Sequence, residues 1–133
     1  MNTQNEFVLL KEDYQLLTKA LETDTQFASL SEEDKEKIRH RLDNAEKVTA
    51  EDFPNTVSRL YDTITIRNIR TRLNLQYKLV PPSEKDEWKD KLSAISPLGI
   101  MLMGVTKGQS ITWQSGKKKN HYSVMEVINA MYI

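Results

Sequence analysis

The 133-residue sequence contains no cysteine, only four glycines, four prolines and two histidines. Without cysteine, neither a disulfide nor a thiolate metal site can form, which is consistent with a reducing compartment. His40 and His121 lie in different parts of the chain, so a histidine-based metal site or catalytic triad is not expected. The four glycines do not form a phosphate-cradling loop. We therefore expect neither a bound metal nor a cofactor.

Long apolar runs are also missing from the sequence. No segment approaches the length of about 20 apolar residues that crosses a membrane, and the opening "MNTQNEFVLLKEDYQ" lacks a basic leader followed by an apolar run. A chain of this length, 38% hydrophobic, can bury an ordinary core. The sequence predicts a monomeric, soluble, cytoplasmic protein with no membrane partner.

The formal net charge is zero, but the charge is distributed unevenly. Residues 1–52 hold 13 acidic and 7 basic side chains, whereas residues 53–133 hold 6 and 12. This asymmetry has two explanations: a glutamate-rich helical half, or two modules that face different surfaces of one partner. Zero net charge argues against a strong grip on a phosphate backbone, so we expect any contact with nucleic acid to be weak or indirect.

The first 50 residues have the pattern of two short helices. Apolar side chains at helical spacing predict one helix from Glu12 to Glu22, and Ser31 before "EEDK" is an N-cap for a second helix to Ala45. Both apolar stripes are narrow, which favours two antiparallel helices packed against each other as a short coiled coil. The apolar positions are Tyr14, Leu16, Leu17, Ala20, Leu21, Ile38, Leu42 and Ala45.

After Pro54 the spacing of the apolar residues changes from the period of a helix to the alternation of a strand. In "TITIRN", Ile64 and Ile66 alternate with polar residues, and "RLNLQYKLV" alternates in the same way. We expect an antiparallel sheet with strands at residues 63–68, 72–80, 92–95, 109–115 and 121–128. The fold class is α+β, with a helical hairpin in residues 1–50 and a sheet domain in residues 51–133.

A short apolar segment, "SPLGIMLMG" at residues 96–104, interrupts the sheet pattern. Ser96 is a natural N-cap, Pro97 fits the first helical position, and Gly104 can end the helix. Leu98 and Leu102, four residues apart, are expected to point into the sheet. One helix cannot bury every direction against one sheet, so we expect some of Ile100, Met101 and Met103 to cover its edge or remain exposed. Their exposure would make a docking surface.

The block "SAISPLGIMLMGVTKGQSITWQSGKKKNHYSVMEVI" resembles the C-terminal domain of the bacterial Gre transcription factors. The similarity is greater to the branch of the regulator of nucleoside diphosphate kinase (Rnk-type) and extends from about Val8 to Ile128. It implies an FKBP-like sheet that docks at the rim of the secondary channel of RNA polymerase, with the helices pointing into that channel. The implied polymerase-binding residues are Ser96, Pro97, Leu98, Gly99, Ile100, Met101 and Met103.

The predicted helical hairpin departs from the Gre pattern. It is much shorter, and its tip carries Glu22 and Asp24 without an Asp-x-x-Glu arrangement. We therefore expect a non-catalytic regulator that competes with longer coiled-coil factors. Two alternatives stay open: stimulation of transcript cleavage by these acids, and a prolyl isomerase or chaperone module. The isomerase needs an aromatic pocket, for which the candidates are Tyr61, Tyr77, Trp113 and Tyr122.

Two predicted turns are rich in basic residues: Arg67, Arg70 and Arg72 surround one, and Lys117, Lys118 and Lys119 lie on the other. Charged turns are commonly just solvated, and lysines on strands also discourage aggregation. The functional alternative is contact with an acidic surface of polymerase or with a nucleic-acid backbone.

Overall fold

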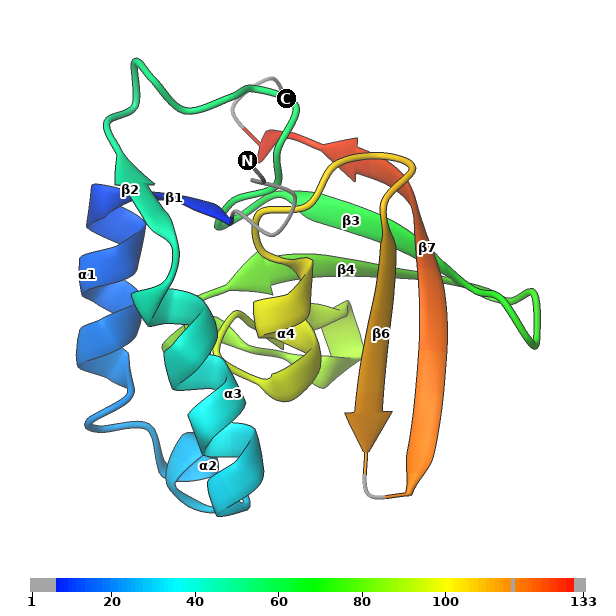
Figure 1. The fold of residues 1–133 in the computed structure, drawn as a ribbon, viewed down its shortest axis with the longest axis horizontal. Helices are drawn as coiled ribbons and strands as arrows, with labels where there is room; N and C mark the ends of the chain where they lie inside the picture. The colour runs from blue at the N-terminus through cyan, green and yellow to red at the C-terminus, as the bar shows by residue number, and fades with distance from the viewer. Residues whose placement is uncertain (1–6, 116, 131–133) are drawn as a thin grey trace.

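The computed structural model of the chain describes residues 7–115 and 117–130. A curled five-stranded sheet, in the order β5-β4-β3-β7-β6, dominates the fold, and the N-terminal helices cover one side of it (Figure 1). This arrangement confirms the predicted α+β class. The strands are β3 (Thr63–Asn68), β4 (Asn74–Val80), β5 (Lys91–Ser93), β6 (Ser110–Ser115) and β7 (Lys118–Ile128).

The central strands follow the alternation in the sequence. Ile64 and Ile66 of β3 are fully buried, and in the antiparallel pairing with β4 they lie opposite Tyr77 and Leu75. The expected bounds of β3 are confirmed to the residue, and β6 and β7 form the second predicted hairpin. Alternation identified these strands because one face of the sheet is buried.

The edge strand β5 corrects the expectation of a wholly antiparallel sheet, because it runs parallel to β4. Two 3₁₀ turns, η1 (Pro82–Glu84) and η2 (Glu87–Lys89), follow β4 and return the chain to the level of Lys78 on the edge of β4. The amide of Lys78 then donates to the carbonyl of Asp90 (2.9 Å), and β5 continues in the direction of β4. Pro81 and Pro82 end β4, and the connection to β5 is a crossover.

The N-terminal part contains more elements than the two predicted helices. They are β1 (Val8–Leu10), α1 (Lys11–Ala20), α2 (Thr25–Ala28), α3 (Glu32–Asp43) and β2 (Glu46–Val48). The strands β1 and β2 pair in parallel, while α1 and α3 run in opposite directions (Figure 1). The predicted N-cap of α3 is confirmed, since the Asp34 amide donates to Ser31 Oγ at 3.1 Å. None of the described helices has the length and apolarity needed to cross a membrane.

The N-terminal helices share one hydrophobic core with the sheet. Leu17, Ile38 and Leu42 belong to the same buried cluster as the apolar residues of β3 and β7. Leu16, expected on the buried stripe, is 43% exposed, because the face of α1 that packs inward centres on Leu17. The boundary at residue 50, the helical hairpin as a coiled coil and the FKBP-like assignment stay predictions.

The helix α4 (Pro97–Leu102) lies between α3 and the sheet and contacts both α3 and β6 (Figure 1). Buried Ser58 holds its C-terminal end. The Ser58 hydroxyl donates to the Leu102 carbonyl (2.6 Å) and accepts from the Val105 amide (2.9 Å). The Ser58 main chain also bonds to Gly104 and Val105. Gly104 has φ +74°, as the sequence led us to expect, and a Cβ there would lie 2.2 Å from the Phe7 ring.

Replacement of the Ser58 hydroxyl should therefore loosen α4. In Ser58→Ala, the buried Leu102 carbonyl and Val105 amide each lose a partner, and we expect the free energy of unfolding to fall by about 2 kcal/mol or more. Urea denaturation followed by circular dichroism measures the change. Ser83→Ala, at an exposed position, is the matched control and should stay within about 0.5 kcal/mol of the parent. Equal stability of the two variants would contradict this role of Ser58.

Candidate docking groove

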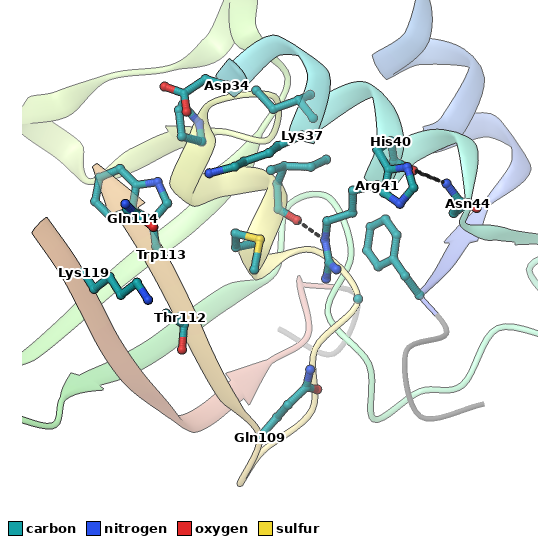
Figure 2. A pocket seen from close by; sticks show the side chains of 16 residues that line it. Asp34, Lys37, His40, Arg41, Asn44, Gln109, Thr112, Trp113, Gln114 and Lys119 are labelled. Atoms are coloured by element: carbon teal, nitrogen blue, oxygen red, sulfur yellow. Dashed lines mark hydrogen bonds between the residues drawn. The ribbon is translucent and has the colours of Figure 1, made fainter. Parts of the chain in front are cut away.

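A groove of about 890 Å³ lies between α3, α4 and β6. We call it the α3–α4–β6 groove. Figure 2 shows side chains of α3 along one wall, those of β6 and Lys119 along the other, and α4 between them. The helix identified from the sequence as the docking element therefore forms part of a concave surface. Its lining includes Lys37, His40, Pro97, Met101, Trp113 and Lys119.

The segment 96–104 supplies the floor of this groove, but with fewer exposed side chains than expected. Pro97 and Met101 line the groove and are partly exposed. Ile100 and Met103 are 2% and 0% exposed, so of the three residues among which some were expected to remain exposed, Met101 is the one that does. The physical reason for the burial of Ile100 and Met103 is that α4 contacts α3 as well as the sheet, and both side chains belong to the hydrophobic core. Leu98 is buried as predicted.

Ser96 and Gly99 have local structural roles. The Ser96 hydroxyl accepts from the Gly99 amide (3.0 Å), which confirms the predicted N-cap, and donates to the Ser93 carbonyl (2.7 Å). A Cβ at Gly99 would lie 1.9 Å from that same carbonyl oxygen, so a larger residue would displace the helix. The Ser-Pro-Leu-Gly pattern thus fixes where α4 begins, and contact of these residues with a partner stays a prediction.

Arg41, which was not predicted as a site residue, joins α3 to α4. Its Nε donates to the Ile100 carbonyl (2.8 Å) and its Nη2 to the Met103 carbonyl (3.0 Å) (Figure 2 shows the first of these bonds). The last carbonyls of a helix have no partner within it and carry the negative end of its dipole, so a guanidinium is well placed there. The guanidinium also lies 4.0 Å from the centre of the Phe7 ring.

Burial lowers the pKa of Arg41 to about 10, yet the group stays charged at neutral pH. Within residues 7–115 and 117–130 it forms no ion pair, so main-chain carbonyls and the Phe7 ring stabilise the charge. One sequence signal could have found it. Arg41 follows Ile38 by three positions and precedes Leu42, which places it beside the apolar stripe of α3.

The rim of the groove carries more positive than negative charge. Lys37 of α3 and Lys119 of β7 are exposed on opposite walls, and Asp34 is the acidic side chain in the lining. Between them lie the apolar surfaces of Pro97, Met101 and Trp113. This combination suits a partner segment that presents apolar side chains flanked by acidic ones.

The other candidate residues lie away from the groove. Glu22 is exposed, and Asp24 caps α2, where its Oδ2 accepts from the Phe27 amide (2.9 Å). Across the described ranges, no group of three or more His, Asp or Glu side chains could hold a metal ion. Arg67, Arg70 and Arg72 lie at the β3–β4 turn, and Lys117 and Lys118 at the β6–β7 turn.

The four aromatic residues considered for a prolyl-isomerase pocket are not brought together in the groove. Of them, Trp113 lines it, whereas Tyr122 is 6% exposed in the core. The Tyr61 hydroxyl donates to Glu84 Oε2 at 2.6 Å, and this bond to the carboxylate raises the pKa of Tyr61 to about 12. This tyrosine is therefore held by a neighbouring loop.

Comparison with known proteins supplies the family. The family model described as "Transcription elongation factor, GreA/GreB, C-term" matches residues 54–129, more than half of the chain. The GreA of Thermotoga neapolitana is 35% identical over 92 residues, which are 69% of this chain and 58% of that protein. The "Regulator of nucleoside diphosphate kinase" of Escherichia coli K12 is 28% identical over 91 residues, 68% of this chain and 67% of that protein.

Solved structures agree with this match. A transcription elongation factor GreA/GreB from Nitrosomonas europaea superposes with a TM-score of 0.72 at 27% identity, over 92% of this chain and 99% of that one. Gfh1 of Thermus aquaticus, at 20% identity and a TM-score of 0.51 over 93% and 99%, shares the fold. The chain belongs to the GreA/GreB family of transcription elongation factors. The family match confirms the resemblance found in the sequence, and the matched stretch spans a little over half the length of the Thermotoga neapolitana relative.

Replacement of Arg41 tests its place at the end of α4. Arg41→Lys keeps the charge, but an ammonium lacks the planar fork that reaches two carbonyls while lying over an aromatic ring. We expect the free energy of unfolding to fall by about 1–3 kcal/mol. Arg39→Lys, at an exposed position two residues earlier in α3, should change it by less than about 0.5 kcal/mol. Urea titrations of both variants would contradict the assignment if Arg41→Lys were as stable as Arg39→Lys.

Proposed function

We propose that this chain is a non-catalytic regulator of transcription that docks on bacterial RNA polymerase through the α3–α4–β6 groove, at the secondary channel. There it competes with longer coiled-coil factors. The observation that carries the proposal is the position of Met101: it lies partly exposed in a groove that is built by the Ser-Pro-Leu-Gly helix of the family match. We infer the partner from the Gre resemblance, and the chemistry of the contact from the residues that line the groove.

The composition of the groove supports a protein partner. Methionine and tryptophan, represented here by Met101 and Trp113, are enriched at the buried centres of protein interfaces, because they offer large contact areas. Lys37 and Lys119 stand at the rim, where charge directs association and orientation more than it adds affinity. An acidic partner segment with one or two protruding apolar side chains fits this arrangement.

The lengths of the helices support the non-catalytic mode. The ten residues of α1 and twelve of α3 span only about 15 and 18 Å. A carboxylate assists a metal ion within about 2 Å of it, so its carrier must reach the reaction centre. Here Leu17 of α1 and Ile38 of α3 are packed into the core shared with the sheet. Helices held in this way cannot extend Glu22 or Asp24 to a distant active centre.

Binding to immobilised RNA polymerase, measured as retention, tests whether the groove is the docking site. Met101→Glu places a charge among apolar contacts, and we expect the affinity for immobilised bacterial RNA polymerase to fall at least about tenfold, which is the effect of 1.4 kcal/mol. Met125→Glu is the matched control, since Met125 is an exposed methionine of β7 outside the groove. It should bind as the parent does. Equal binding of the two variants would remove Met101 from the interface, and a parent that does not bind would end the proposal.

Transcript cleavage assays test the mode of action. Added to stalled polymerase complexes, the chain should leave the transcript uncleaved, and in excess it should slow the cleavage stimulated by a long coiled-coil Gre factor, because both occupy one site. The length of the RNA on a denaturing gel reports both effects. Cleavage by the parent chain that disappears in Glu22→Gln with Asp24→Asn would instead support the catalytic alternative. Asparagine is used because it still caps α2.

A further inference from the structure

The hairpin formed by β3 and β4 projects beyond the rest of the sheet (Figure 1). Its end, residues 67–75, carries three arginines and two strongly exposed aliphatic side chains, Ile69 (54%) and Leu73 (66%). The turn itself is well ordered by hydrogen bonds: the Asn68 side chain accepts from the amides of Arg70 and Thr71 at 2.9 and 3.0 Å. Cations are thus presented on a narrow, firmly shaped ribbon. We refer to residues 67–75 as the β3–β4 tip.

The arginines of this tip are not neutralised. Arg70 and Arg72 are exposed, and no ion pair within the described ranges includes them or Arg67. Among the described residues, the Arg67 side chain donates to the Asn74 side-chain oxygen, at 3.4 Å. The sequence has no Asp or Glu in residues 63–83 or 91–125, which contain β3, β4, β6 and most of β7. The sequence segments that form the β3–β4 tip and the neighbouring part of the β6–β7 hairpin therefore contain no carboxylate.

A pocket of about 390 Å³ extends this basic surface from the tip to the neighbouring hairpin. The amide of Ile69 donates to the His121 carbonyl (3.0 Å), which holds the tip beside β7. The pocket contains no carboxylate among its lining residues, which include Arg70, Thr112, Lys119, Asn120 and His121. Lys117 and Lys118 follow at the β6–β7 turn. The cations therefore form a band across two hairpins rather than a single cluster.

We propose that the β3–β4 tip and this pocket bind the phosphate backbone of duplex DNA. A guanidinium presents donors that match phosphate oxygens, and a two-stranded ribbon has the width of a DNA groove. Exposed aliphatic side chains such as Ile69 and Leu73 can contact sugars or base edges once the arginines hold the backbone. Because the acidic N-terminal half brings the net charge to zero, the binding is weak and independent of sequence. This surface shares Thr112 and Lys119 with the edge of the groove, but the β3–β4 tip lies outside the groove and the inference does not rest on the proposed function.

Fluorescence anisotropy with the whole chain and a labelled 20-base-pair duplex tests the inference. Each phosphate contact adds about 0.9 to the slope of log affinity against log salt, so the parent should show a slope of about −2 to −4. In Arg70→Gln with Arg72→Gln, we expect about fivefold or more loss of affinity at low salt and a slope smaller by about 1–2. The control, Lys85→Gln with Lys89→Gln, removes the same charge from exposed positions in the β4–β5 connection. It should retain the affinity of the parent.

A second variant, Lys117→Gln with Lys118→Gln, tests the other hairpin and should weaken binding as well, even if the first variant folds poorly. Four results would overturn the inference. They are no binding by the parent at the lowest salt, equal losses in the arginine variant and its control, binding of single-stranded RNA but not of the duplex, and loss of polymerase retention in the arginine variant without any binding of DNA. Met101→Glu should keep its affinity for DNA, which separates this surface from the groove.

Discussion

The contact on which the candidate site depends is that of the Arg41 guanidinium with the carbonyls that end α4. A six-residue helix has too few internal hydrogen bonds to hold its own direction. Here Ser96 caps its start, while Arg41 and Ser58 bond the carbonyls at its end. Both ends of α4 are thus fixed to different parts of the chain. The result is a short helix whose remaining open side, with Met101 on it, faces a groove instead of the core.

This arrangement explains why a chain rich in charge keeps so many apolar residues in one short segment. Leu98, Ile100, Leu102 and Met103 are buried in the hydrophobic core that the N-terminal helices share with the sheet. Four of the five large apolar side chains are therefore structural, and the fifth is available to a partner. In the proposed docking surface, the same helix therefore completes the core and presents the contact.

Local chemistry allowed part of the fold to be predicted from the sequence. The caps at Ser31 and Ser96 need only residues three positions away, and the bounds of β3 follow from alternation on a half-buried sheet. The three-residue strands β1 and β2 are too short for any period to appear. The burial of Ile100 and the bonds of Arg41 depend on partners about 60 residues apart, and no local pattern reports such a contact. Of the candidate site, the helix was predictable, but the wall that α3 adds was not.

The separation of Arg41 from its partners also bears on how the protein emerges from the ribosome. Ile100 and Met103 follow Arg41 by 59 and 62 residues, which at about 5–20 residues per second take about 3–12 s to synthesise. Isolated helices of ten or twelve residues are marginal in water, so α1 and α3 cannot become stable during this interval. The N-terminal helices must therefore wait for α4, and the nascent polypeptide acquires the tertiary structure around them only after residues 97–103 have been synthesised.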